Sequence, residues 1–136
     1  MENIKWTPEL SVGVSEIDEQ HQKLYAIIDE LKQLQNKVLD KRALLGILTQ
    51  LVDYSDYHFR TEDNYMIENS YPLFLSHRKE HLAYIKNLGE LINDLEKTGT
   101  LPTEDILNFL CDWWQTHIVQ SDLKYARYIK AQKGTT

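Results

Sequence analysis

The sequence predicts an all-α protein, an up-down-up-down antiparallel four-helix bundle with an N-terminal arm. Apolar residues recur at intervals of three and four almost everywhere after Ile17, which is typical of amphipathic helices. The 136 residues include only 5 Gly and 3 Pro, so few breaks interrupt the chain. No segment alternates polarity for long enough to form a sheet. Short connections between four such helices favour antiparallel neighbours.

Length and composition fit a single domain over residues 1–136, with 42% apolar and 26% charged residues. The formal net charge of −6 argues against binding to a phosphate backbone. The single cysteine, Cys111, cannot form an internal disulfide, which favours a reducing compartment. No apolar run reaches the length of a signal peptide or a membrane span. We therefore expect a cytoplasmic monomer that binds neither nucleic acid nor membranes.

The first half of the chain contains the arm and two expected helices. Residues 1–17 form the arm, which we expect to pack across the bundle through Trp6. The first helix covers about 18–38, and Asp18 lies in its first turn, where an acidic group suits the helix dipole. The second helix covers about 41–68, with leucine and isoleucine along one stripe.

The second half contains the other two expected helices. The third covers about 72–98, because Ser70 can cap it and Pro72 is tolerated in a first turn. Gly99 closes it in the usual C-terminal position. The fourth helix covers about 103–131.

The histidines all lie on the apolar stripes of these helices, which face the core. They are His21, His58, His77, His81 and His117. If a stripe covers roughly a third of a helix surface, five randomly placed histidines would all fall on it well under one time in a hundred. Burying that many rings without partners costs about 1 kcal/mol or more each. A metal centre is the economical explanation, because neutral imidazole is a common metal ligand.

Two carboxylates accompany the histidines. Glu62 follows His58 by four residues, so both point to the same side of a helix. Asp122 follows His117 by five residues, which turns about 140° around an ideal helix. Two metals side by side, or a π-bulge, would allow both side chains to reach the centre.

The number of ligands argues against zinc, which takes four. Five nitrogens and two carboxylates suit a pair of iron ions bridged by the carboxylates. The ferritin-like di-iron sites use Glu-x-x-His pairs, and this chain has none.

With these residues in place, the chain resembles a single-domain bacterial hemerythrin. The segments that carry the resemblance are WTPELSVGVSEIDEQH, HFRTED, HRKEH and WWQTHIVQSD. The resemblance implies two iron ions, one bound by three histidines and one by two, with an oxo or hydroxo bridge. The implied ligands are His77, His81 and His117 for the first iron, His21 and His58 for the second, and Glu62 and Asp122 for both.

The resemblance also implies reversible O2 binding at the two-histidine iron, in a protein that is not an enzyme beyond a weak oxidase or peroxidase side activity. We expect the O2 pocket wall to come from residues one turn from the ligands, namely Leu24, Phe59, Trp113, Trp114, Ile118 and Tyr125. Trp114 departs from the family, which more often has leucine at this position.

Three other functions fit parts of the sequence. HRKEH matches an inverted zinc-peptidase motif with Glu80 as the base, although this leaves His21, His58 and His117 unexplained. A di-iron oxidase, or an enzyme that handles peroxide or iron, would use the same centre, as would an iron or oxygen sensor. As an oxygen carrier, the chain could supply an oxygen-consuming enzyme.

Overall fold

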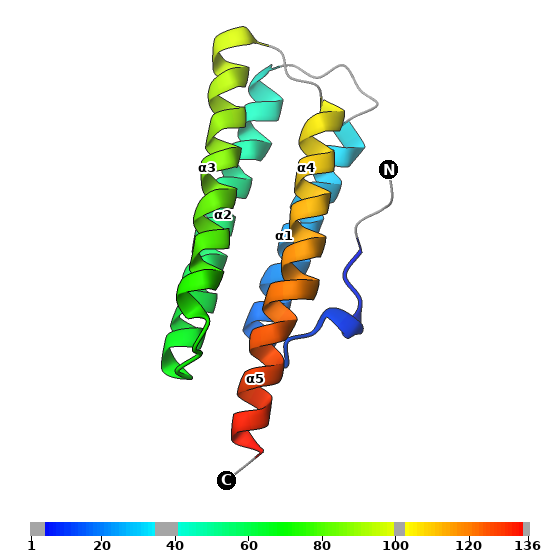
Figure 1. Cartoon of the computed structure of the whole chain (residues 1–136). Coiled ribbons are helices and arrows are strands. Elements are labelled where there is room, and N and C mark those ends of the chain that lie inside the picture. Colours follow the sequence, from blue (N-terminus) through cyan, green and yellow to red (C-terminus); the bar gives the residue numbers. More distant parts are fainter. Residues whose placement is uncertain (1–4, 35–40, 100–102, 135–136) are drawn as a thin grey trace.

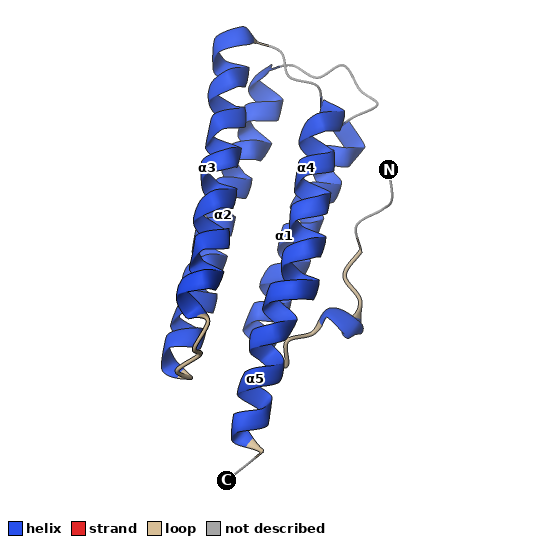
Figure 2. Cartoon of the chain, viewed as in Figure 1, coloured by secondary structure: helices blue, strands red, loops and turns tan. Residues whose placement is uncertain are grey.

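The structure is a computed structural model that describes residues 5–34, 41–99 and 103–134. Its elements, in chain order, are the 3₁₀ turn η1 (Pro8–Leu10), α1 (Ser15–Leu34), α2 (Lys41–Glu68), α3 (Phe74–Thr98), α4 (Thr103–Thr116), the π-helical turn η2 (His117–Asp122) and α5 (Leu123–Lys133). Over those three ranges the regular structure is helical throughout, without strands (Figure 2).

The helices form four rods that lie side by side and alternate in direction, as Figure 1 shows, and α4, η2 and α5 together make the fourth rod. Helix α2 packs against both α1 and α3, and α1 also packs against α4. The expected all-α four-helix bundle is confirmed. Within the described ranges, no helix combines the length and the apolar character that crossing a membrane requires.

The apolar interior is divided into two clusters. The large apolar cluster draws buried residues from α1 to α4 and η2, including Leu24, Leu48, Leu88 and Leu110. The small apolar cluster lies beyond it, and its buried members are Val12, Ile17, Met66, Tyr71, Tyr125 and Ile129. Along every rod, buried polar residues separate the members of one cluster from those of the other.

The arm packs on the bundle, and it determines where α1 begins. The carboxylate of Asp18 accepts hydrogen bonds from the Ser11 hydroxyl (2.5 Å) and from the Val12 backbone N–H (2.9 Å). The Asp18 N–H bonds to the Val14 carbonyl, so α1 starts at Ser15, three residues before the expected start at 18. Asp18 therefore lies in the first turn, as expected, and its carboxylate also anchors the arm. The expected end of this helix, 35–38, lies outside the described residues.

The turn after α2 corrects the expected start of the third helix. Ser70 adopts a left-handed conformation with φ 53°. The Tyr71 N–H bonds to the Met66 carbonyl (2.9 Å) and the Ser70 N–H to the Ile67 carbonyl (3.1 Å), which is a Schellman motif. Ser70 thus terminates α2 instead of capping α3. Helix α3 begins only at Phe74, two residues later than expected.

Candidate metal centre

The seven predicted ligand residues all lie within the four rods. Helix α1 carries His21, α2 carries His58 and Glu62, α3 carries His77 and His81, and η2 carries His117 and Asp122. Each of the seven is at most 3% exposed. They lie between the large and the small apolar clusters, because on each rod they occupy the turns that separate the two.

The π-helical turn brings Asp122 into this set. The expected helix 103–131 runs on to Lys133, and residues 117–122 within its rod are π-helical. A π turn carries more residues per turn than an α-helix, so it reduces the angle between side chains five residues apart. As a result, Asp122 Oδ1 lies 3.0 Å from His117 Nε2.

The side chains form two overlapping groups whose ligand atoms lie within 4.8 Å of one another. One group contains His77, His81 and His117, and the other contains His21 and His58; both contain Glu62 and Asp122. The two carboxylates therefore lie between the two sets of histidines.

The approaches of carboxylate oxygens to histidine nitrogens are short. Asp122 Oδ2 lies 3.1 Å from His21 Nε2, and its Oδ1 lies 3.0 Å from His77 Nε2. Glu62 Oε1 lies 3.1 Å from His81 Nε2. His81 Nε2 and His117 Nε2 are themselves 3.1 Å apart. Six side chains thus direct polar atoms into one small space.

Many of these atoms have no hydrogen-bond partner among the described residues. They include both nitrogens of His21, Nε2 of His58 and of His77, Oε1 of Glu62 and both carboxylate oxygens of Asp122. A buried polar atom without a partner costs on the order of 1–3 kcal/mol. Metal ions would satisfy these atoms, since imidazole nitrogen and carboxylate oxygen are the donors that iron and similar metals take. The residues present therefore fit a metal centre.

The carboxylates change the pKa values of the nearest histidines when no metal is bound. Burial opposes protonation of His21, but the adjacent carboxylates of Asp122 and Glu62 raise its pKa to about 9. Burial also opposes protonation of His77, but the same two carboxylates outweigh it and raise the pKa to about 10. For His117, burial is again outweighed, chiefly by the charge of Asp122, and the pKa rises to about 9.

The remaining groups shift the other way. Burial lowers the pKa of His58 to about 3, so this ring is neutral at ordinary pH. Burial opposes ionisation of Glu62 and Asp122, but the surrounding histidines hold the pKa of each carboxyl well below its usual range. Without metal, the two carboxylates are therefore balanced by protonated rings.

Side chains outside the seven approach three of the histidines, two of them through hydrogen bonds and Asp63 only at ion-pair distance. Gln20 Oε1 lies 2.8 Å from His58 Nδ1, and Glu80 Oε1 lies 3.1 Å from His117 Nδ1. Asp63 Oδ1 lies 3.4 Å from His81 Nδ1. These three contacts were not predicted from the sequence. Each is adjacent in sequence to a predicted ligand but serves a histidine elsewhere in the chain, so only the packing of the helices reveals the pairing.

The residues predicted for the pocket wall do not all lie together. Leu24, Phe59, Trp114 and Ile118 are buried in the large apolar cluster, and Trp113 packs against it, half-buried. Tyr125 belongs to the small apolar cluster instead. Its hydroxyl donates to Glu62 Oε2 (2.7 Å), so it holds a predicted metal ligand.

Aromatic rings border both groups of histidines. Phe59 stacks on His81 with centroids 3.8 Å apart, and Trp113 stacks on His117 at 4.4 Å. The Trp114 ring lies 5.9 Å from that of His58. Its indole N–H donates to the hydroxyl of Tyr84 (3.2 Å), which fixes the ring against the two-histidine group.

Comparisons with known proteins agree with this geometry. Residues 12–129 match the family model of the hemerythrin HHE cation binding domain. The chain is 29% identical over 124 residues to a bacteriohemerythrin of Clostridium acetobutylicum, covering 88% of this chain and 96% of that protein. It is 28% identical over 122 residues to a hemerythrin-like protein of Naegleria gruberi, covering 88% of each.

A solved structure supports the fold. A crystal structure of wild-type hemerythrin superimposes with a TM-score of 0.84 at 23% identity, covering 91% of this chain and 95% of the other. The family match spans most of the chain, including all seven candidate ligands. The chain belongs to the hemerythrin family.

Proposed function

We propose that this chain binds O2 reversibly at a non-haem di-iron centre. The observation that carries the proposal is the pair of overlapping groups of buried histidines that share Glu62 and Asp122, with most of their donor atoms unpartnered. One iron would be held by His77, His81 and His117 and the other by His21 and His58, with both carboxylates bridging. Membership of the hemerythrin family supports non-haem iron and O2 as the ligands.

The two positions have different numbers of protein ligands, which suits O2 binding at one of them. When bound, the two ferrous ions supply an open coordination position and the two electrons that reversible O2 binding requires. The group of His21 and His58 provides one imidazole fewer than the other, so an open position would fall on its side once iron is bound. Trp114 and Phe59 close this side with apolar surface and exclude water.

A carrier fits the surroundings better than an enzyme. The rings of Phe59 and Trp114 lie 5.8 Å and 5.9 Å from that of His58, and neither side chain is an acid or a base. Substrate chemistry usually needs such a group to move a proton. The bridging Glu62 receives its hydrogen bond from Tyr125, which keeps that carboxylate in place.

The proposed role is oxygen storage, delivery to an oxygen-consuming enzyme, or oxygen sensing, by a monomer in the cytoplasm. The net charge of −6 supports a protein that does not associate with nucleic acid. The organisation proposed for the chain is a single domain.

Metal analysis combined with absorption spectroscopy tests the function. The iron-loaded protein should contain about two iron ions per chain, as the ligand number of the two groups requires. Adding O2 to the anaerobic, reduced protein in a stopped-flow instrument should produce a visible charge-transfer band, and removing O2 should restore the starting spectrum. One zinc per chain would favour the peptidase reading, and irreversible oxidation with turnover would favour an enzyme.

A further inference from the structure

Three histidines of the candidate centre direct Nε2 toward the other ligands and Nδ1 away from them. Nδ1 of His58 is hydrogen-bonded to Gln20 and Nδ1 of His117 to Glu80, whereas Asp63 lies 3.4 Å from His81 Nδ1 without a hydrogen bond. Partners of this kind fix the tautomer of a metal-binding histidine and adjust how strongly it donates to the metal. These contacts therefore affect the centre although the partners bind no metal.

The outer partners differ in charge between the two groups. Glu80 and Asp63 are carboxylates, and both contact histidines of the three-histidine group. Gln20 is a neutral amide, and it contacts a histidine of the two-histidine group. A carboxylate that accepts the Nδ1–H of an imidazole draws the proton more strongly than an amide does, so Nε2 becomes the better donor.

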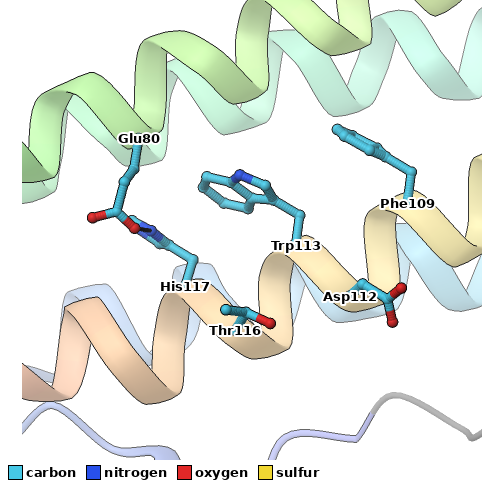
Figure 3. A pocket seen from close by; sticks show the side chains of 6 residues that line it. All are labelled: Glu80, Phe109, Asp112, Trp113, Thr116 and His117. Carbon is cyan, nitrogen blue, oxygen red and sulfur yellow. Dashed lines mark hydrogen bonds and ion pairs between the residues drawn. The ribbon is translucent and has the colours of Figure 1, made fainter.

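Two residues of η2 hold Glu80 in place. Its Oε1 accepts a hydrogen bond from the Ser121 hydroxyl (2.6 Å) as well as the contact from His117 Nδ1 (3.1 Å). Figure 3 shows Glu80 reaching from α3 toward His117, beside Trp113. The Glu80 side chain is 43% exposed and lines a surface pocket of about 350 Å³. The carboxylate thus spans the gap between α3 and η2 at the edge of the bundle.

The orientation of Gln20 is also determined by its neighbours. The Thr61 hydroxyl donates to the Tyr57 carbonyl (3.3 Å), which leaves its oxygen to accept from Gln20 Nε2 (3.1 Å). The amide oxygen of Gln20 must then face His58 Nδ1, so that nitrogen carries the proton and Nε2 keeps its lone pair for the centre. Gln20 therefore positions His58 without adding charge.

We propose that Glu80 is a positioning residue that makes the three-histidine position the more strongly donating of the two, acting through His117, whereas the neutral Gln20 leaves the two-histidine position the weaker. The inference rests on the proposed di-iron function. Stronger donation stabilises the ferric state, so the carboxylate lowers the reduction potential of the three-histidine iron. The chain thereby distinguishes its two metal positions by the charge of their outer partners as well as by ligand number.

Three variants of the full chain test this role. Glu80→Gln keeps an acceptor for His117 but removes the charge. Glu80→Asp keeps the charge but shortens the side chain, which breaks the 3.1 Å contact. Glu90→Gln removes an exposed carboxylate ten residues further along α3, about 15 Å away at the rise of an α-helix, and serves as the control.

The readouts are the midpoint potential of the iron-loaded protein, from a spectroelectrochemical titration, and its iron affinity. We expect Glu80→Gln to shift the potential to a more positive value and to weaken iron binding about tenfold or more, while Glu90→Gln changes neither. Glu80→Asp should shift the potential in the same direction as Glu80→Gln, because the effect passes through the hydrogen bond.

Two results would overturn the role of Glu80. One is a potential and affinity for Glu80→Gln equal to those of Glu90→Gln. The other is a Glu80→Asp variant that behaves like the unsubstituted chain, because a field effect alone would then suffice. Failure of the di-iron function itself would look different, since the unsubstituted chain would then bind no iron pair at all.

Discussion

Asp122 Oδ1 lies 3.0 Å from His117 Nε2, although the two residues are five apart in one rod. The π-helical turn makes this short distance possible, since an α-helix would separate the two side chains by about 140°. Asp122 also approaches His21 and His77, so its carboxylate contacts both groups of histidines.

Asp122→Asn should therefore affect both metal positions together. The amide keeps the shape of the side chain but loses the charge that balances two metal ions. We expect iron affinity to fall at least about tenfold, with both ions lost in parallel when iron content is measured against free iron. Loss of only one ion would contradict a bridging role.

His58→Ala should remove one metal position selectively. His58 belongs only to the two-histidine group, so the other group keeps its full set of histidines. Iron content should fall from about two ions per chain toward one, because a single ligand is lost from the poorer site. O2-dependent changes in the absorption spectrum should disappear. A variant that still binds O2 reversibly would disprove the ligand assignment.

Metal loading should release protons. The pKa values of His21, His77 and His117 are raised to about 9, 10 and 9, so all three rings are protonated at pH 7 without metal. A metal binds only the neutral imidazole. Anaerobic loading in a weakly buffered solution with a pH indicator should therefore acidify the medium, and affinity should rise with pH up to about 9–10. Loading without acidification would show that these rings are already neutral.

The same shifts predict how stability depends on pH in the metal-free chain. A raised histidine pKa contributes stability that is fully present below its ordinary value near 6.5 and is lost as the pH rises through the folded value. The three histidines should therefore lower the melting temperature of the metal-free protein between about pH 7 and 10. The iron-loaded protein should show a smaller decrease in circular-dichroism melts, because metal replaces the protons.

Trp114→Leu should open the two-histidine side of the centre. The smaller side chain leaves a cavity beside His58 and Phe59 and removes the hydrogen bond to Tyr84. We expect destabilisation of about 2–3 kcal/mol and faster loss of the O2-bound spectrum, because water reaches the site more easily. Trp114→Phe is the matched control, since it keeps a buried ring without the N–H. Equal decay rates for both variants and the unsubstituted chain would contradict a role in excluding water.

Ser70→Gly should stabilise the protein without touching the centre. A serine at φ 53° is strained by about 1–2 kcal/mol, part of which is offset by the greater freedom of glycine when unfolded. The melting temperature should rise by a few degrees while iron content stays the same. A lower melting temperature would show that Ser70 makes a contribution that outweighs its backbone strain.

Helical periodicity and the histidine pattern were enough to predict the bundle and to name the seven candidate ligands. The structure brings these seven side chains together. Two boundaries were wrong: the first helix begins three residues earlier than expected and the third begins two residues later. Asp18 bonds back to the arm, and Ser70 ends α2. The spacing of His117 and Asp122 did indicate a π-bulge as one solution, and the structure contains that turn.

The outer partners could not be predicted in this way. Gln20 and Glu80 precede a ligand in sequence but contact a histidine of another rod, so their pairing depends on how the rods are rotated. Tyr125 likewise has the periodicity of a core residue, and only the packing shows its hydroxyl at Glu62.

None of the seven candidate ligands lies in a connection between rods, since 35–40, 69–73 and 99–102 contain none of them. The described turn at 69–73 therefore supplies no candidate ligand to the centre. Circularly permuted or loop-grafted versions of the chain, cut at the turn around 69–73 for example, should therefore keep their chemistry wherever the rods still assemble.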